Sequence, residues 1–259
     1  GEGLEIYPAL TPQTHQQEIP EQKIPTGIDE LDTQLGGGIE QNTVTFLSGP
    51  TGVGKSSLSA QLATKTGTDG TTAVYLFEES IQSFTMRTES LGIPVTELQK
   101  DGTLLLRAIE PLAHSAEEFA SIIQQDVSDH GVDTVLIDGI DGYTMALQGQ
   151  QKRLLTKLHS LTRYLTNDHV TVFITDEISN VTGISSATSV NASYIADNII
   201  ALNYIEEESQ IRRIIAVLKK RTGTFENTFR EFELTADGIQ VSEPLEGMTG
   251  ILQGVPQQT

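Results

Sequence analysis

The chain has 259 residues, with 35 acidic and 16 basic side chains, a formal net charge of −19 and no cysteine. The lack of cysteine excludes disulfides, thiolate metal sites and cysteine nucleophiles, and the negative charge argues against binding to the phosphate backbone of nucleic acids. No apolar run reaches about 18 residues, so we expect no transmembrane span and a cytoplasmic location.

Lysine is scarce in this acidic chain, with only eight residues. One interpretation is an ordinary acidic surface. The other is a halophilic protein, adapted to a salt-rich cytoplasm in which ions screen the repulsion between carboxylates. The acid-rich, lysine-poor composition favours the second interpretation.

Residues 1–22 are polar and contain prolines, and we expect an N-terminal segment or inter-domain linker there, followed by one domain over residues 23–259. A short helix is predicted within residues 24–38, ending at three consecutive glycines. Strands then alternate with helices of about 10–15 residues, a pattern typical of βαβ units and a parallel sheet buried on both faces. The predicted strands are 43–48, 71–77, 103–109, 132–138 and 170–177, and the predicted helices are 55–66, 81–91, 115–129 and 150–165.

The pattern changes near residue 198. Two apolar stretches around a polar tip predict a β-hairpin over residues 198–221. A second hairpin is predicted over residues 229–241, with Asp237 and Gly238 as its turn. The predicted fold class is therefore α/β, with a mostly parallel central sheet flanked by helices and antiparallel C-terminal hairpins.

The sequence "GPTGVGKSS" contains the G-x-x-x-x-G-K-S pattern of a P-loop, between a predicted strand and a predicted helix. Its glycines let backbone N–H groups face an anion, and the helix N-terminus adds a favourable dipole. The lysine is expected to reach the β- and γ-phosphates of ATP, and the first serine to ligate Mg²⁺. The predicted nucleotide-binding residues are Gly49, Pro50, Thr51, Gly52, Val53, Gly54, Lys55, Ser56 and Ser57.

A P-loop also needs an acidic residue for its magnesium ion. Asp138 follows the apolar run "VLI" at the end of a predicted strand, which suits a Walker B aspartate. The alternative is a strand-end aspartate that caps the next turn. Given the P-loop, we interpret Ser56 and Asp138 as the metal ligands.

Two carboxylates, Glu78 and Glu79, follow the apolar strand "TTAVYLF". Ligands of open parallel sheets lie beyond the carboxyl ends of the strands, so at least one of the pair is a candidate base for the water that attacks the γ-phosphate. The alternative is that both face solvent or cap the next helix. Asp176 and Glu177 also end a predicted strand, and their pattern leaves open whether they sense the γ-phosphate or face water.

Three adjacent cations end the first predicted hairpin in "LKKRTGTFE". Strand alternation places Lys219 and Arg221 on one face and Lys220 on the other. A Lys/Arg pair that faces a γ-phosphate stabilises negative charge in the transition state, whereas charges on an edge strand also protect against aggregation. The pattern alone does not separate these two roles.

Taken together, these motifs resemble the KaiC-like branch of the RecA-type P-loop ATPases. The resemblance is carried by "TGIDELDTQLGGG", "SGPTGVGKSS", "FEES", "VLIDG", "VLKKRTGTFENTFREFELTADGIQV" and "LEGMTGILQGVP", which extend from residue 26 to residue 256. It implies a RecA-like core that forms a homo-hexameric ring with ATP between subunits. It also implies that Glu78 and Glu79 are the catalytic glutamates, with Glu78 the base, and that Lys219 and Arg221 reach the neighbouring subunit's ATP.

The resemblance has further implications at the start of the chain and near residue 193. The opening "GLEIYPAL" looks like the junction between the two halves of tandem family members, and we expect this chain to be the second half of such a protein. The clock protein of the family phosphorylates itself on adjacent Ser and Thr. Ser193 is kept here as a candidate phosphoacceptor, but Tyr194 stands in the Thr position, and Phe225 stands where the family often has His.

The function predicted from the sequence is a ring-forming regulatory ATPase with ATP and Mg²⁺ as ligands, acting on a signalling partner that the sequence does not identify. Three alternatives are a RecA-type DNA recombination or repair ATPase, a nucleotide-sensing scaffold without turnover, and an autokinase acting on Ser193. The loop after residue 177 contains no Lys or Arg before residue 198, which argues against DNA binding.

Overall fold

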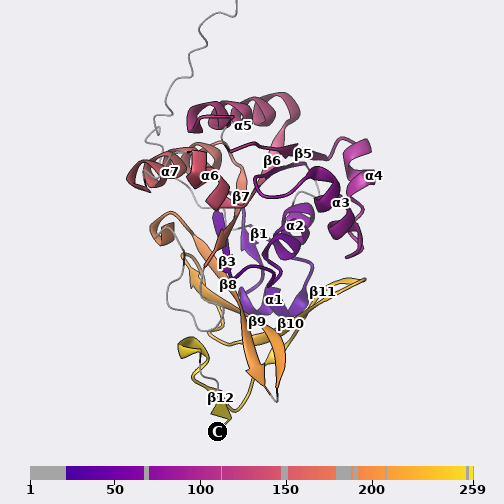
Figure 1. Cartoon of the computed structure of the whole chain (residues 1–259), viewed down its shortest axis with the longest axis vertical. Helices are drawn as coiled ribbons and strands as arrows, with labels where there is room; N and C mark the ends of the chain where they lie inside the picture. The colour runs from indigo at the N-terminus through magenta and orange to yellow at the C-terminus, as the bar shows by residue number, and fades with distance from the viewer. Residues whose placement is uncertain are drawn as a thin grey trace, which may run out of the picture.

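A computed structural model describes residues 22–66, 70–111, 113–146, 151–178, 188, 192–207, 209–254 and 257–258 of the chain. Its main feature is a nine-stranded sheet in the order β11-β10-β9-β8-β3-β7-β6-β4-β5 (Figure 1). The strands are β3 (Val44–Gly49), β4 (Thr71–Leu76), β5 (Leu104–Ala108), β6 (Val132–Asp138), β7 (Thr171–Glu177), β8 (Asn198–Glu207), β9 (Gln210–Lys220), β10 (Arg230–Thr235) and β11 (Gly238–Pro244).

Six neighbouring strands, from β8 to β5, run parallel, and the two C-terminal hairpins extend the sheet with antiparallel strands. This arrangement confirms the predicted fold class. The helices are α1 (Asp29–Gln34), α2 (Lys55–Thr66), α3 (Ile81–Glu89), α4 (Val95–Lys100), α5 (Ala116–His130), α6 (Ile140–Ala146) and α7 (Gln151–Asn167).

The parallel strands are buried on both faces, which explains their continuous apolar sequences. Side chains such as Phe46 and Ile137 pack with α5, α6 and α7 in one cluster, whereas Leu47 and Leu136 pack with α1 to α4 in the other. The two sets of helices accordingly lie on different sides of the sheet (Figure 1). None of the helices among the described residues is long and apolar enough to cross a membrane.

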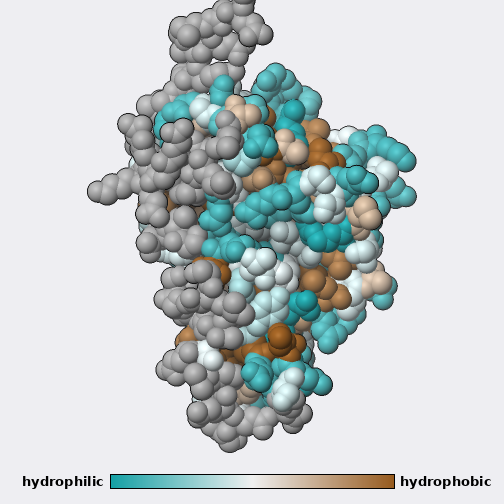
Figure 2. Space-filling view, in the orientation of Figure 1, coloured by the Kyte–Doolittle hydropathy of each residue, from teal (hydrophilic) through white to brown (hydrophobic). Residues whose placement is uncertain are grey.

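Smaller elements complete the fold. Two short two-stranded sheets pair β1 (Lys23–Ile24) with β2 (Ile39–Glu40) and β12 (Met248–Thr249) with β13 (Gln257–Gln258). A third, small apolar cluster joins the β8–β9 hairpin to the C-terminal segment through Ile205, Ile214 and Ile251. In Figure 2, hydrophobic residues are visible at the lower end of the molecule, in the region of this hairpin.

The sheet brings the candidate site together at one edge. β4, β6, β7 and β3 are consecutive neighbours and parallel, so their carboxyl ends lie side by side. Gly49 at the end of β3 pairs in register with Glu177, and Leu76 at the end of β4 pairs with Asp138. The P-loop and the acidic strand ends therefore share one edge of the sheet, where ligands of parallel α/β folds bind.

Candidate active site

The P-loop connects β3 to α2, as the sequence predicts. Gly52 and Gly54 have φ of +77° and +117°, and a β-carbon at Gly54 would also lie only 3.4 Å from the Phe232 ring. These positions require glycine because other residues rarely adopt such backbone angles. The Lys55 amine donates hydrogen bonds to the carbonyls of Gly49 (2.8 Å) and Pro50 (3.0 Å), so it lies folded against its own loop.

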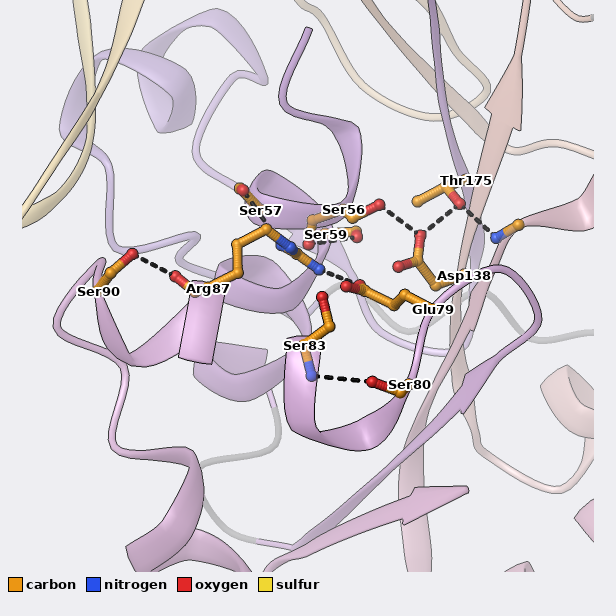
Figure 3. Close-up of polar contacts among 11 residues, drawn as sticks. Ser56, Ser57, Ser59, Glu79, Ser80, Ser83, Arg87, Ser90, Asp138 and Thr175 are labelled. Atoms are coloured by element: carbon orange, nitrogen blue, oxygen red, sulfur yellow. Dashed lines mark hydrogen bonds and ion pairs between the residues drawn. The ribbon is translucent and has the colours of Figure 1, made fainter. Parts of the chain in front are cut away.

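Ser56 and Asp138 lie in direct contact, although they are 82 residues apart in the chain. The Ser56 hydroxyl donates a 2.9 Å hydrogen bond to Oδ1 of Asp138, and the Thr175 hydroxyl donates a 2.7 Å bond to the same oxygen. The backbone N–H of Gly139 donates to the Thr175 hydroxyl in turn, at 2.7 Å (Figure 3). Sequence reasoning missed Thr175, whose one signal is a hydroxyl within the apolar run "VTVFIT".

The Asp138 side chain is buried, and burial raises the pKa of its carboxyl, while the hydrogen bonds from Thr175 and Ser56 lower it. A hydroxyl oxygen and a carboxylate oxygen that meet at the start of the P-loop helix form the donor set that Mg²⁺ prefers. Ser56 and Asp138 therefore fit the predicted metal site.

Glu78 lies beside Gly139, the residue after Asp138. A β-carbon at Gly139 would lie 2.8 Å from both Cγ and Cδ of Glu78, and Gly139 has a φ of +92°, so glycine leaves the space that the glutamate occupies. Burial, followed by the charges of Asp141, Asp138 and Glu177, raises the pKa of the Glu78 carboxyl, and Lys55 opposes this shift. A carboxylate whose pKa is raised in this way is a stronger base than an ordinary carboxylate.

Other acidic side chains surround the same edge. Asp176 is completely buried and accepts a 3.3 Å hydrogen bond from the Ser48 hydroxyl, so it does not face water, which was one of the two predicted alternatives. Burial and the charges of Asp176 and Glu177 raise the pKa of Asp141.

Lys55 is the cation that faces this group of carboxylates. Burial lowers the pKa of its amine, while the charges of Glu177 and Glu78 raise it.

Glu79 differs from Glu78 in its contacts. Its carboxylate forms an ion pair with Arg87 on α3, and Arg87 also donates a 3.2 Å hydrogen bond to the Ser57 hydroxyl (Figure 3). Sequence reasoning missed Arg87. Its one sequence signal is that it is the only basic residue of α3.

Lys219 and Arg221 lie away from the P-loop of the same chain. Asn198 is the first residue of β8. It pairs with Lys220 on β9 and with Thr45 near the start of β3, so Lys220 lies at the amino ends of β8 and β3. The P-loop follows the opposite end of β3. The structure thus places the two cations near the edge of the sheet opposite to the acidic residues.

The two side chains nevertheless share one face, as strand alternation predicts. The Lys219 amine donates 2.6 Å hydrogen bonds to the carbonyls of Ser193 and Ala196, and Arg221 pairs with Asp197 at 3.1 Å. Lys220 points the other way and forms a buried ion pair with Glu40.

Ser193 is exposed and lies in a short 3₁₀ helix, η1 (Ala192–Tyr194), next to these cations. Tyr194 is 54% exposed, and its ring lies 5.8 Å from the His159 ring. Phe225 packs against the core cluster of Leu47. The N-terminal stretch "GLEIYPAL" and most of the loop after β7 lie outside the described residues.

Comparison with known proteins agrees with this geometry. A family model described as "ATPase: KaiC" matches residues 24–246. The chain is 26% identical over 258 residues to the circadian clock protein KaiC3 of Synechocystis sp., an alignment that covers 99% of this chain and 50% of that protein. It is 26% identical over 255 residues to the circadian clock oscillator protein KaiC of Thermostichus vulcanus, covering 98% of this chain and 49% of that protein.

The chain thus spans about half the length of the curated relatives that it matches. The match to the family model covers residues 24–246, which include the P-loop, the acidic strand ends and both C-terminal hairpins. The chain therefore belongs to the KaiC family of ATPases.

Proposed function

We propose that this chain binds Mg²⁺–ATP at the P-loop and hydrolyses it, as one subunit of a ring-forming regulatory ATPase. The observation that carries the proposal is the assembly at one edge of the sheet: Ser56 hydrogen-bonded to Asp138, Lys55 on the loop, and Glu78 beside them with a raised pKa. A nucleotide sensor without turnover needs the Ser56–Asp138 metal site and Lys55, but it does not need a base such as Glu78.

Each residue has a defined task in this proposal. The loop amides and Lys55 bind the phosphates, for which Lys55 exchanges its two loop carbonyls for phosphate oxygens. Ser56 and Asp138 would hold Mg²⁺, which neutralises negative charge on the phosphates when it is bound. Glu78 accepts a proton from the water that attacks the γ-phosphate, and its raised pKa makes it a stronger base than an ordinary carboxylate.

The position of Lys219 and Arg221 supports a ring. Near the sheet edge opposite to the P-loop, they are placed to serve the ATP of a neighbouring subunit, as the family resemblance implies. The relatives are named as circadian clock proteins. By analogy, the nucleotide state of a homo-hexamer of this chain would regulate a signalling partner.

A phosphate acceptor is a second candidate role, and the exposure of Ser193 favours it. Because Ser193 adjoins Lys219 and not its own P-loop, the phosphate would come from the neighbouring subunit. Mass spectrometry after incubation with ATP tests this: phosphate on Ser193 that is lost in Ser193→Ala supports it, and unmodified Ser193 excludes it.

The test of ATP hydrolysis is turnover in molar KCl by the native chain, by Glu78→Gln and by the control Glu97→Gln, which changes an exposed glutamate in α4. We expect turnover in the native chain and the control, and a loss of at least about 100-fold in Glu78→Gln. Equal turnover in all three would contradict the role of Glu78. Binding without turnover in the native chain would indicate a sensor.

The ring is tested by mixing two inactive variants. Glu78→Gln lacks the proposed base but keeps Arg221, and Arg221→Ala lacks the cation but keeps Glu78. If the cation acts on the neighbouring subunit, mixed rings contain some complete sites and turnover returns. If mixing restores nothing while both variants still bind ATP and assemble, Arg221 does not act between subunits.

A further inference from the structure

Arg87 is a cation at the nucleotide site that no P-loop motif includes. It lies in the last turn of α3 and reaches back along the helix, with its guanidinium 5.2 Å from the centre of the Phe84 ring. Its two terminal nitrogens contact different elements: one pairs with Glu79, and the other donates to the Ser57 hydroxyl. Arg87 therefore connects the glutamate pair after β4 to the first turn of the P-loop helix (Figure 3).

These contacts are well placed to restrain Glu79. Ser57 is buried, and the side chains of Arg87 and Glu79 are 29% and 21% exposed, so the pair is only partly hydrated. A guanidinium that bonds two partners and stacks on an aromatic ring loses less conformational freedom per bond than a lysine would. Among the described residues, Glu78 by contrast has no hydrogen bond or ion pair.

We propose that Arg87 is a positioning residue of the ATPase site: it holds the Glu79 carboxylate against the first turn of α2 and thereby leaves Glu78 as the carboxylate that activates water. The inference rests on the proposed ATP hydrolysis and gives a physical reason why adjacent glutamates differ in role. Arg87 also adds positive charge beside Asp138, where it opposes the charge of Glu79. Arg87 and Lys55 thus offset part of the negative charge of the carboxylates around the site, which an anionic nucleotide must enter.

The first test uses turnover of Arg87→Gln, Arg87→Lys, Glu79→Gln and the double variant Glu79→Gln/Arg87→Gln over a range of pH. Arg87→Gln removes a positive charge, so the acid limb of kcat should move to higher pH by about half a unit and kcat should fall about tenfold. Arg87→Lys keeps the positive charge but cannot make both hydrogen bonds. The acid limb of its kcat–pH profile should therefore stay in place, and its kcat should fall less than that of Arg87→Gln. Glu79→Gln should move the limb to lower pH.

The double variant decides whether Arg87 acts through Glu79. If it does, kcat of the double variant falls no further than that of Arg87→Gln, and the two opposite pH shifts largely cancel. The control is Arg212→Gln, which removes the ion pairs of another partly exposed arginine, on β9, to Glu207 and Glu231. A merely structural role for Arg87 would lower the yield or stability without moving the pH limb.

The second test does not depend on turnover. A fluorescent ADP analogue is titrated without Mg²⁺, at fixed ionic strength, into the native chain and the arginine variants. Loss of the Arg87 charge should raise Kd about threefold to tenfold in Arg87→Gln and little in Arg87→Lys or Arg212→Gln.

The outcomes separate the two proposals. A folded Arg87→Gln with unchanged kcat, pH limb and ADP affinity overturns the inference while ATP hydrolysis stands. If the native chain shows no turnover, the proposed function fails, and the ADP titration alone judges Arg87: an equal Kd overturns its role. If Arg87→Gln does not fold, Glu79→Gln and Arg87→Lys replace it, and an unmoved pH limb in Glu79→Gln overturns the inference.

Discussion

The Lys55 amine and the Gly49 carbonyl are joined by a 2.8 Å hydrogen bond, which ties the P-loop lysine to the end of β3. A protonated amine held by carbonyl oxygens costs little to release, because phosphate oxygens replace these acceptors and carry negative charge. The amine of Lys55 thus already lies where the phosphates are proposed to bind.

The first prediction concerns this lysine. Replacement by alanine should weaken ATP binding by at least about 100-fold, since a charge-assisted contact to phosphate is lost from a partly buried site. The fold should persist, because only two loop hydrogen bonds are removed. Isothermal titration calorimetry checks the affinity, and Lys100→Ala, an exposed lysine in the last turn of α4, is the control. Equal affinities would contradict phosphate binding by Lys55.

The second prediction follows from the raised pKa of Glu78. A general base must be ionised, so kcat should fall as pH decreases through this pKa, which is raised above its ordinary value. Asp141 is the first of the charges that raise it. Asp141→Asn removes that charge, lowers the pKa of Glu78 and should move the acid limb to lower pH by about half a unit.

The measurement is kcat between about pH 5 and pH 9 at constant ionic strength. Glu110→Gln, which changes an exposed glutamate just after β5, serves as the control and should leave the limb in place. An acid limb that stays fixed in Asp141→Asn would show that another group limits the rate.

The parts of this structure that the sequence predicted depend on contiguous residues. The strands carry apolar runs because both faces of the parallel sheet are buried, and the P-loop is a contiguous motif between a strand and a helix. Asp138 ends β6, and Glu78 lies two residues after the last residue of β4. Neighbouring carboxyl ends in a parallel sheet then bring them together without further information.

The parts that were missed depend on contacts between elements. Arg87 is eight residues from Glu79 and 30 from Ser57, and its role exists only because α3 packs beside α2. Thr175 ends the apolar run "VTVFIT", and only its hydroxyl marks it as polar. The six-residue helix α4 was also missed, because it is too short to show a helical period and begins directly after Pro94.

The third prediction concerns the ion pair between Lys220 and Glu40, whose side chains are 0% and 4% exposed. Lys220→Met leaves the Glu40 carboxylate buried without its partner, and should lower the free energy of unfolding by about 3–5 kcal/mol. Replacing both residues with apolar ones should restore most of the loss. Urea denaturation measures these values.

The matched comparison is a partly exposed arginine, Arg212, whose side chain is 33% exposed. Arg212→Gln removes ion pairs to Glu207 and Glu231 near the surface and should cost less than about 1 kcal/mol. If Lys220→Met costs no more than Arg212→Gln, the buried carboxylate finds another partner or becomes protonated, and the pair does not stabilise the fold.

The fourth prediction uses the net charge of −19. Repulsion among carboxylates destabilises the compact state, and added ions screen it, so the melting temperature should rise by about 5 °C or more between roughly 0.1 and 2 M KCl. Calorimetry at several salt concentrations measures this rise. A melting temperature that is constant or falls with KCl would contradict the halophilic interpretation of the composition.

A charge variant separates screening from a general effect of salt on hydrophobic burial. Glu97, Glu206 and Glu233 are exposed, and replacing each with lysine raises the net charge without touching the core. If repulsion causes the salt dependence, this variant should melt higher at low salt and gain less from KCl than the native chain. An equal gain in both chains would assign the effect to hydrophobic burial, which salt strengthens regardless of surface charge.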